Sequence, residues 1–288
     1  MEGAIGVIGG SGLYAMPGLT EVQEVRVTTP FGDPSDAFIT GRLHGRRMVF
    51  LPRHGVGHRI LPHEINFRAN LWGFKHLGVE RLISVSAVGS MKESIAPGHL
   101  VLADQFIDRT RRRVQTFYGD GIVVHVPFAE PICPTVRAGL YAARTGVDTP
   151  VHERGTYLCI DGPQFSTKAE SLLYRSWGVD VFGMTNMPEA KLAREAEICY
   201  ATIALATDYD CWHESEESVT VEAVLRTLKA NVERAQHLID GFVRNAPAER
   251  GCGLCATAAR TSLMTDPARI PEATKQRLQP ILRHFMPV

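Results

Sequence analysis

The sequence predicts an α/β protein, with one large domain followed by a C-terminal extension. Short apolar runs of strand length alternate with amphipathic stretches of helical period, which is typical of a β-sheet covered by helices. No internal repeat or linker divides this pattern. The composition changes after Asn245, where Pro247, a cysteine pair and small residues follow a long amphipathic helix. We therefore expect a domain over residues 1–245 and an extension over residues 246–288 packed on it.

The composition limits the possible partners. Among 288 residues, 31 Lys and Arg balance 31 Asp and Glu, so the overall charge favours neither nucleic acid nor an acidic membrane surface as a partner. No apolar run has the length of a membrane span, and the N-terminus does not resemble a secretion signal. We expect a cytoplasmic protein that binds small molecules.

The first strand, residues 4–8, leads into a glycine-rich turn around Ser11. The spacing of the glycines fits a dinucleotide-binding fingerprint, but Pro17 and Gly18 would break the long helix that this fingerprint requires. Two interpretations remain. The glycines could direct backbone N–H groups at an anion, with Ser11 adding a hydroxyl, or they could form a tight turn that needs positive φ.

A hairpin of two strands, residues 37–43 and 46–51, is predicted around His44-Gly45. The second strand leads to Arg53 and His54, which lie among glycines and apolar residues. This setting favours an oxyanion-binding site over solvated loop charges, because Arg offers a planar fork of donors. A helix over residues 63–76, ended by Gly78, is expected next.

Strands over residues 80–85, 100–107, 155–160 and 179–182 follow, and small polar residues stand after several of them. The strand over residues 155–160 ends in a loop that carries Phe165. Thr167 and Glu170 form a capping box behind this loop, so a helix begins there and leaves Phe165 exposed as a candidate stacking platform. A further helix is expected to begin at Pro188. The basic run over residues 109–113 is expected to be solvated or to contact another subunit.

The last strand, residues 200–207, is apolar and ends at Asp208 and Asp210. Ligands of α/β sheets bind outside the carboxyl ends of the strands, so two acids there would face a ligand. Ionised carboxylates only accept hydrogen bonds, which suits the donor groups of a heterocyclic base. A structural alternative is that Asp208 opens a turn and Asp210 caps the next element.

Six cysteines do not form the pattern of a secreted disulfide-rich protein. Cys252 and Cys255 make the only C-x-x-C motif. A four-thiolate zinc site would need a second pair, which the sequence lacks, so we expect no metal and either a local disulfide or free thiols, with a redox role as a third alternative. The other four are expected as buried thiols: Cys133, Cys159, Cys199 and Cys211.

Six motifs together resemble the trimeric purine nucleoside phosphorylase superfamily, and within it the branch that acts on S-methyl-5′-thioadenosine. They occupy residues 9–12, 53–55, 66–70, 161–166, 184–189 and 207–212, and the resemblance extends in order over residues 4–243. It implies a mixed, partly barrel-like β-sheet flanked by helices. It also implies reversible phosphorolysis, in which phosphate displaces the base with inversion and serves as co-substrate without any cofactor.

The resemblance assigns roles to individual residues. It implies that phosphate is bound by Ser11, Arg53, His54, Ser86, Ala87 and Thr185. It implies that the nucleoside is bound by Phe165, Ser166, Met184, Asp208 and Asp210, and that His58, Val221 and Val224 shape the 5′-methylthio pocket. His125 would enter this pocket from a neighbouring subunit, which implies a trimer or a dimer of trimers.

The two carboxylates would select an adenine base, because they accept hydrogen bonds from a 6-amino group and face a 6-oxo group unfavourably. Asp208 is the candidate acid for N7 of the departing purine, which requires its protonation through burial and the charge of Asp210. Other hypotheses are a phosphorylase for methylthioinosine, adenosine or 5′-deoxyadenosine, a hydrolytic nucleosidase, and a nonenzymatic purine or phosphate sensor.

Overall fold

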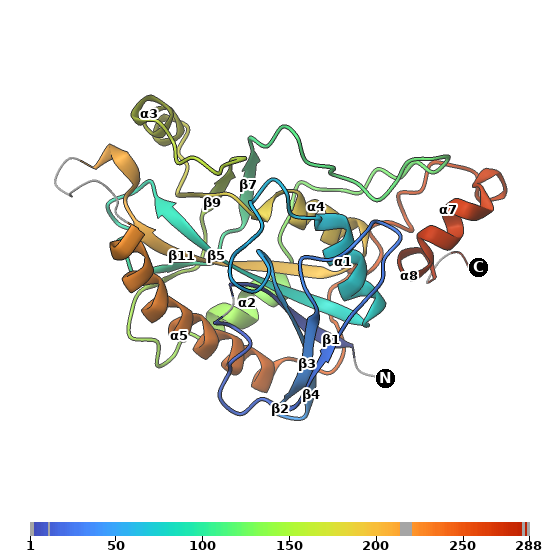
Figure 1. Cartoon of the computed structure of the whole chain (residues 1–288), viewed down its shortest axis with the longest axis horizontal. Coiled ribbons are helices and arrows are strands. Elements are labelled where there is room, and N and C mark those ends of the chain that lie inside the picture. The colour runs from blue at the N-terminus through green and yellow to red at the C-terminus, as the bar shows by residue number, and fades with distance from the viewer. Residues whose placement is uncertain (1–2, 11, 214–220, 284–285, 287–288) are drawn as a thin grey trace.

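The computed structural model describes residues 3–10, 12–213, 221–283 and 286, with the backbone alone for residues 221–226 (Figure 1). The strands are β1 (Ala4–Gly9), β2 (Thr20–Val25), β3 (Phe38–Leu43), β4 (Arg46–Pro52), β5 (Val79–Ser90), β6 (Leu100–Val101), β7 (Gln105–Asp108), β8 (Val151–His152), β9 (Thr156–Cys159), β10 (Val181–Gly183) and β11 (Cys199–Asp208). The helices are α1 (Phe67–His76), α2 (Pro134–Ala142), α3 (Lys168–Ser176), α4 (Asn186–Glu195), α5 (Val221–Asn245), α6 (Gly253–Ala256), α7 (Glu272–Arg277) and α8 (Gln279–Leu282), with 3-10 turns η1 (Asp210–Trp212) and η2 (Pro267–Arg269).

The described strands form one mixed sheet in which β5 is the branch point. The main path runs β2-β3-β4-β1-β5-β10-β9-β7, while β11 pairs with β5 and β6, and β6 pairs with β8. β5 is parallel to β1 and β11 and antiparallel to β10. The predicted mixed sheet in an α/β fold is therefore confirmed.

Helices cover both faces of the two central strands. α1 and α4 pack on one face of β5 and β11, and α2 and α5 pack on the other (Figure 1). β11 is buried along its whole length except at Asp208. This explains its almost continuous apolar sequence, since a strand covered on both faces has no polar side.

Several local predictions are confirmed. The hairpin turns at His44 and Gly45, which have φ values of 51° and 77°, between the paired residues Leu43 and Arg46. Thr167 accepts the N–H of Glu170, whose carboxylate accepts the N–H of Thr167, so the capping box is present. These features depend on neighbouring residues alone, which is why the sequence predicts them well.

Other predictions are wrong at the boundaries. The helix expected from residue 63 begins at Phe67, because the side chain of Asn66 caps it by accepting the N–H of Ala69 at 3.1 Å. The strand expected over residues 80–85 continues to Ser90, and the strand expected over 100–107 is divided into β6 and β7. The sequence patterns also missed β2, β8 and α2.

The extension contacts the domain through backbone groups. Glu197, which lies two residues before β11 and is 1% exposed, accepts the N–H groups of Ala259 and Arg260 at 3.1 Å each. The indole N–H of Trp72 on α1 donates to the carbonyl of Arg277 at 3.2 Å. No helix in the described part of the chain is both long and apolar enough to cross a membrane.

Candidate functional site

A gap in the central sheet marks the candidate site. β1 pairs with β5 as far as Ser84, and β10 pairs with it from Gly89 onward, so residues 85–88 have no described partner strand on that side. Ala87 is the exposed residue of an otherwise buried or half-buried strand. A crevice where the strand order changes is the usual ligand site of α/β sheets.

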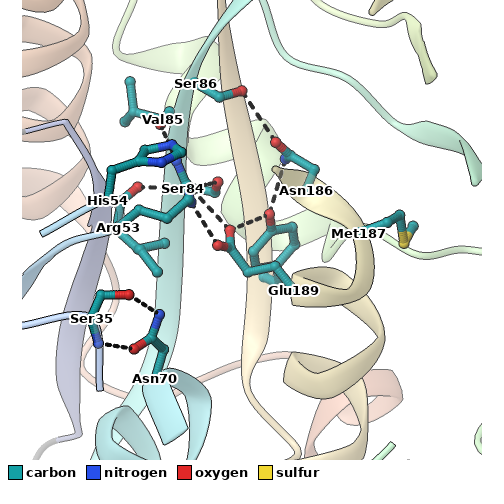
Figure 2. Close-up of polar contacts among 12 residues, drawn as sticks. Ser35, Arg53, His54, Asn70, Ser84, Val85, Ser86, Asn186, Met187 and Glu189 are labelled. Atoms are coloured by element: carbon teal, nitrogen blue, oxygen red, sulfur yellow. Dashed lines mark hydrogen bonds and ion pairs between the residues drawn. The ribbon is translucent and has the colours of Figure 1, made fainter. Parts of the chain in front are cut away.

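A buried ion pair lies directly beneath this gap. Arg53, which follows β4 and is 1% exposed, donates Nε–H to Glu189 at 2.8 Å and Nη2–H to the other oxygen of Glu189 at 3.1 Å. Figure 2 shows the guanidinium also reaching β5, with bonds to the carbonyl of Val85 at 2.9 Å and the hydroxyl of Ser84 at 2.6 Å. Burial alone would lower the pKa of Arg53, but the charge and hydrogen bonds of Glu189 act in the opposite direction, and the pKa of Arg53 is raised.

A hydrogen-bond chain links this ion pair to the open part of the gap. The Tyr200 hydroxyl donates to Glu189 at 2.8 Å and accepts from the amide of Asn186 at 2.9 Å. The Asn186 oxygen in turn accepts from the hydroxyl of Ser86 at 3.1 Å (Figure 2). Glu189 lies near the start of the helix expected from Pro188, and nothing in the sequence pattern indicates its pairing with Arg53.

Three predicted site residues carry buried polar atoms without a hydrogen-bond partner among the described residues. These atoms are Thr185 Oγ1, Ser166 Oγ and Asp210 Oδ2. An unsatisfied buried polar atom typically costs about 1–3 kcal/mol, so a bound molecule with matching groups would be stabilised there. Thr185 itself is 6% exposed and immediately precedes α4, next to the Asn186–Ser86 hydrogen bond.

His54 is neutral at pH 7. Its Nδ1 lies 2.9 Å from the carbonyl of Ile60 and therefore carries the proton that it donates. Burial lowers the pKa of His54 to about 4, in spite of this hydrogen bond. The ring of His58, which is exposed, stacks on His54 with 4.3 Å between the ring centroids. The remaining ring nitrogen of His54, Nε2, is then a hydrogen-bond acceptor.

The two carboxylates at the end of β11 differ in environment. Asp208 is half-buried and accepts the hydroxyl of Thr207 at 2.7 Å and the N–H of Asp210 at 2.9 Å. Asp210 is 7% exposed, and burial, with the charge of Asp208 as a smaller cause, raises its pKa. The expected protonation of Asp208 when the nucleoside is bound stays a prediction. The Asp208–Asp210 hydrogen bond also makes the predicted turn.

The loop over residues 161–166 is held by an arginine from the basic run. Arg113 is 8% exposed and donates to the carbonyls of Asp161 at 3.0 Å and Met187 at 2.5 Å. The expectation that the run over residues 109–113 is solvated is therefore wrong for Arg113. Phe165 is 63% exposed on the same loop, as predicted, and Met184 is half-buried after β10.

The contacts among the described residues do not connect some of the predicted residues with the gap. His125 is exposed on a loop, where its backbone N–H donates to the carbonyl of Ser262 at 3.0 Å. Ser11 lies outside the described residues, and Val221 and Val224 lie in α5 where side chains are not described. Gly9 does not have the positive φ expected of a tight turn. A Cβ there would lie 2.9 Å from the carbonyl of Val85, so close packing requires this glycine.

The cysteines also differ from expectation. Cys211 is exposed, whereas we expected it to be buried, and Cys252 and Cys255 are unbonded. The second cysteine pair, which the sequence did not show, is supplied by the fold, since Cys133 and Cys199 lie beside the C-x-x-C motif.

Known proteins match this chain over nearly its whole length. A family model described as the phosphorylase superfamily matches residues 4–244. The S-methyl-5′-thioadenosine phosphorylase of Geobacter sulfurreducens is 59% identical over 287 residues, covering 99% of this chain and 100% of that protein. The enzyme of the same name from Koribacter versatilis is 55% identical over 285 residues, covering 99% and 97%.

Solved structures give the same result. A methylthioadenosine phosphorylase from an Antarctic soil metagenome aligns with a TM-score of 0.93 and 46% identity, covering 98% of this chain and 100% of that chain. The Schistosoma mansoni methylthioadenosine phosphorylase in complex with adenine aligns with a TM-score of 0.82 and 36% identity, covering 96% and 98%.

We predict that Glu189→Gln lowers the free energy of unfolding by about 3–5 kcal/mol, because it leaves the buried charge of Arg53 without its counter-charge. Glu195→Gln is the matched control. Glu195 is also buried on α4, but it accepts hydrogen bonds from neutral groups, the Thr116 hydroxyl and the Phe117 N–H. Burial raises the pKa of Glu195 to about 7, so its neutral form is accessible. Urea denaturation should therefore show a clearly smaller loss for the control, and equal losses would contradict a special role of the ion pair.

Proposed function

The chain belongs to the phosphorylase superfamily, and from this membership we propose that it cleaves S-methyl-5′-thioadenosine with phosphate, giving adenine and 5-methylthioribose 1-phosphate. One observation carries this proposal. The buried hydroxyl of Thr185, which has no hydrogen-bond partner among the described residues and suits phosphate, lies next to the Asn186–Ser86 hydrogen bond at the gap, while Asp208 lies opposite Gly89 on the neighbouring strand. Two residues along a strand span roughly 7 Å, which suits a sugar between a phosphate and a base.

On the phosphate side, the hydroxyl of Thr185 and the N–H of Ala87 would donate to phosphate oxygens. The hydroxyl of Ser86 donates to Asn186 in this structure and would have to rotate away from it to join them. Neutral His54 would accept the remaining proton of a hydrogen phosphate at Nε2. Most donors of Arg53 are engaged by protein groups, so its contribution would be mainly a fixed positive charge near the anion. Ser11 would complete the set from the glycine-rich turn.

On the base side, Asp208 and Asp210 would read N7 and the 6-amino group of adenine. The raised pKa of Asp210 supports a pair that retains one proton when the nucleoside is bound. Asp208 would pass this proton to N7 as the bond to the sugar breaks, and general acids of this kind contribute typically ~10²–10⁴-fold. Phe165 and Ser166 would border the ring, and Met184 would lie against the ribose.

The reaction needs no covalent intermediate. As the bond to the base breaks, positive charge develops on the sugar carbon, and the bound phosphate is both its nearest counter-charge and its nucleophile. Accurate positioning therefore provides much of the acceleration. The bound phosphate oxygens and the Asp208–Asp210 pair would lie on opposite sides of the sugar, which accounts for inversion at that carbon.

We predict that the purified protein converts S-methyl-5′-thioadenosine to adenine only when phosphate is added, with 5-methylthioribose 1-phosphate as the second product by mass spectrometry. Adenine formation without phosphate would instead identify a hydrolytic nucleosidase, and the absence of any turnover would indicate a binding protein.

We predict that Thr185→Val, which removes one unsatisfied hydroxyl, raises the KM for phosphate about tenfold and changes the KM for the nucleoside little.

We predict that Asp208→Asn reduces kcat/KM for S-methyl-5′-thioadenosine by about 10²–10⁴-fold, because the amide cannot supply the proton to N7. Its activity on methylthioinosine should fall much less, since an amide N–H can donate to a 6-oxo group. Asp148→Asn, which alters a surface ion pair with Arg234, is the control and should leave both rates unchanged. An unchanged ratio of the two activities in Asp208→Asn would refute the assignment of the base site.

The 5′ end of the substrate would lie against His58, Val221 and Val224, with His125 entering from a neighbouring subunit. We predict a trimer, or a pair of trimers, in light scattering, and an increased KM for the nucleoside in His125→Ala. A monomer with full activity would contradict this arrangement.

The sequence also predicts a cytoplasmic location and no nucleic-acid partner, membrane partner or catalytic cofactor. These stay predictions.

A further inference from the structure

Four cysteine side chains converge at the end of β11 that is remote from Asp208. Cys133 immediately precedes α2, Cys199 is the first residue of β11, and Cys252 and Cys255 lie at α6 in the extension. Their four Sγ atoms all lie within 4.8 Å of one another, and none is bonded to another. The exposed fractions of these residues are 0%, 0%, 7% and 1%, so water has little access to the cluster.

The spacing of the sulfurs suits a single metal ion. Zinc binds thiolate sulfur at about 2.3 Å in a tetrahedron, which places the four sulfurs roughly 3.8 Å apart. Two disulfides would need only two close pairs, whereas here each sulfur is near all three others. A cluster of several iron and sulfide atoms would hold its cysteines farther apart than one ion does.

The arrangement of the ligands along the chain is that of a structural site. A C-x-x-C motif supplies two neighbouring ligands, and two cysteines from the rigid domain supply the others, as in closed four-thiolate zinc sites. No open position would remain for water or substrate. The separation from the base site agrees with this, because Asp208 lies nine residues after Cys199 along β11, roughly 30 Å of strand.

The surroundings compensate part of the negative charge of such a site. Four thiolates and one divalent ion carry a net charge of minus two, which needs a counter-charge when buried. Arg194 on α4 is 2% exposed, and its positive charge acts on Cys255. Its side chain is held in place by hydrogen bonds to the carbonyls of Pro127 and Glu130. Cys133 also lies at the N-terminal end of α2, where the helix dipole favours negative charge.

We propose that Cys133, Cys199, Cys252 and Cys255 bind one zinc ion. Each thiol loses its proton on binding, and the ion joins the start of α2, the start of β11 and the extension. The metal stabilises the fold and takes no part in phosphorolysis. The sequence suggested no metal, because a second cysteine pair is recognisable only after folding brings residues 133 and 199 together.

The test is the metal content of the whole chain, expressed with added zinc and purified under a reducing agent. We expect one zinc per chain by elemental mass spectrometry, and replacement by cobalt should give the visible spectrum of tetrahedral thiolate coordination. Cys252→Ser with Cys255→Ser should lose the zinc. Cys159→Ser (buried) and Cys211→Ser (exposed) lie outside the cluster and should retain it.

A second measurement keeps the proposal testable if the double variant does not fold. Removing zinc from the native protein with a chelator should lower the Tm and make four more thiols reactive, with kcat unchanged at temperatures where the protein stays folded. Wild-type protein without zinc would overturn the proposal, whether its four cysteines are then free thiols or two disulfides by peptide mapping. These readouts do not depend on the substrate, so the proposed activity can fail without affecting them.

Discussion

The ion pair between Arg53 and Glu189 is the interaction on which the candidate site depends. The two side chains are 136 residues apart in sequence and both are almost fully buried. A buried ion pair is stabilising only where its remaining polar atoms are also satisfied. Here the guanidinium also bonds to the carbonyls of Ile8 and Val85, and the carboxylate accepts the hydroxyl of Tyr200. One pair of charges thus fixes the relative positions of β1, β4, β5, β11 and α4.

The same guanidinium explains how the sheet can contain a gap. Where β1 ends, the carbonyl groups of β5 lose their strand partner and would be left unsatisfied in the interior. Nη1 of Arg53 takes the place of a strand N–H at Val85, so β5 continues through residues 85–88 without a described partner strand on that side, until β10 pairs with it at Gly89. The carbonyl of Val85, which lies near the opening at Ala87, is therefore satisfied by Arg53. The charge that permits the gap is also the charge that would attract an anion into it.

The sequence predicted the features that depend on neighbouring residues and missed those that depend on distant ones. The hairpin at His44, the capping box at Thr167 and the strand ending at Asp208 were all predicted, because propensity and periodicity act within a few residues. The glycine and serines after Val85 suggested a strand end, but pairing with β10 and β11 overrides that local preference. The partner of Arg53 and the grouping of four cysteines could not be predicted, since each joins segments that are adjacent only in the folded chain.

The turn at the end of β11, where the proposed base site lies, depends on one hydrogen bond. Asp208 accepts the N–H of Asp210, and this bond holds Asp210 at a φ of 56°, which is unusual for a residue with a side chain. Burial raises the pKa of Asp210, and the charge of Asp208 contributes to this shift. The two carboxyl groups are thus coupled, and the burial of Asp210 favours a proton retained by the pair. The proposed base site would both accept from an amino group and donate to a ring nitrogen, and it needs such a proton because two ionised carboxylates could only accept.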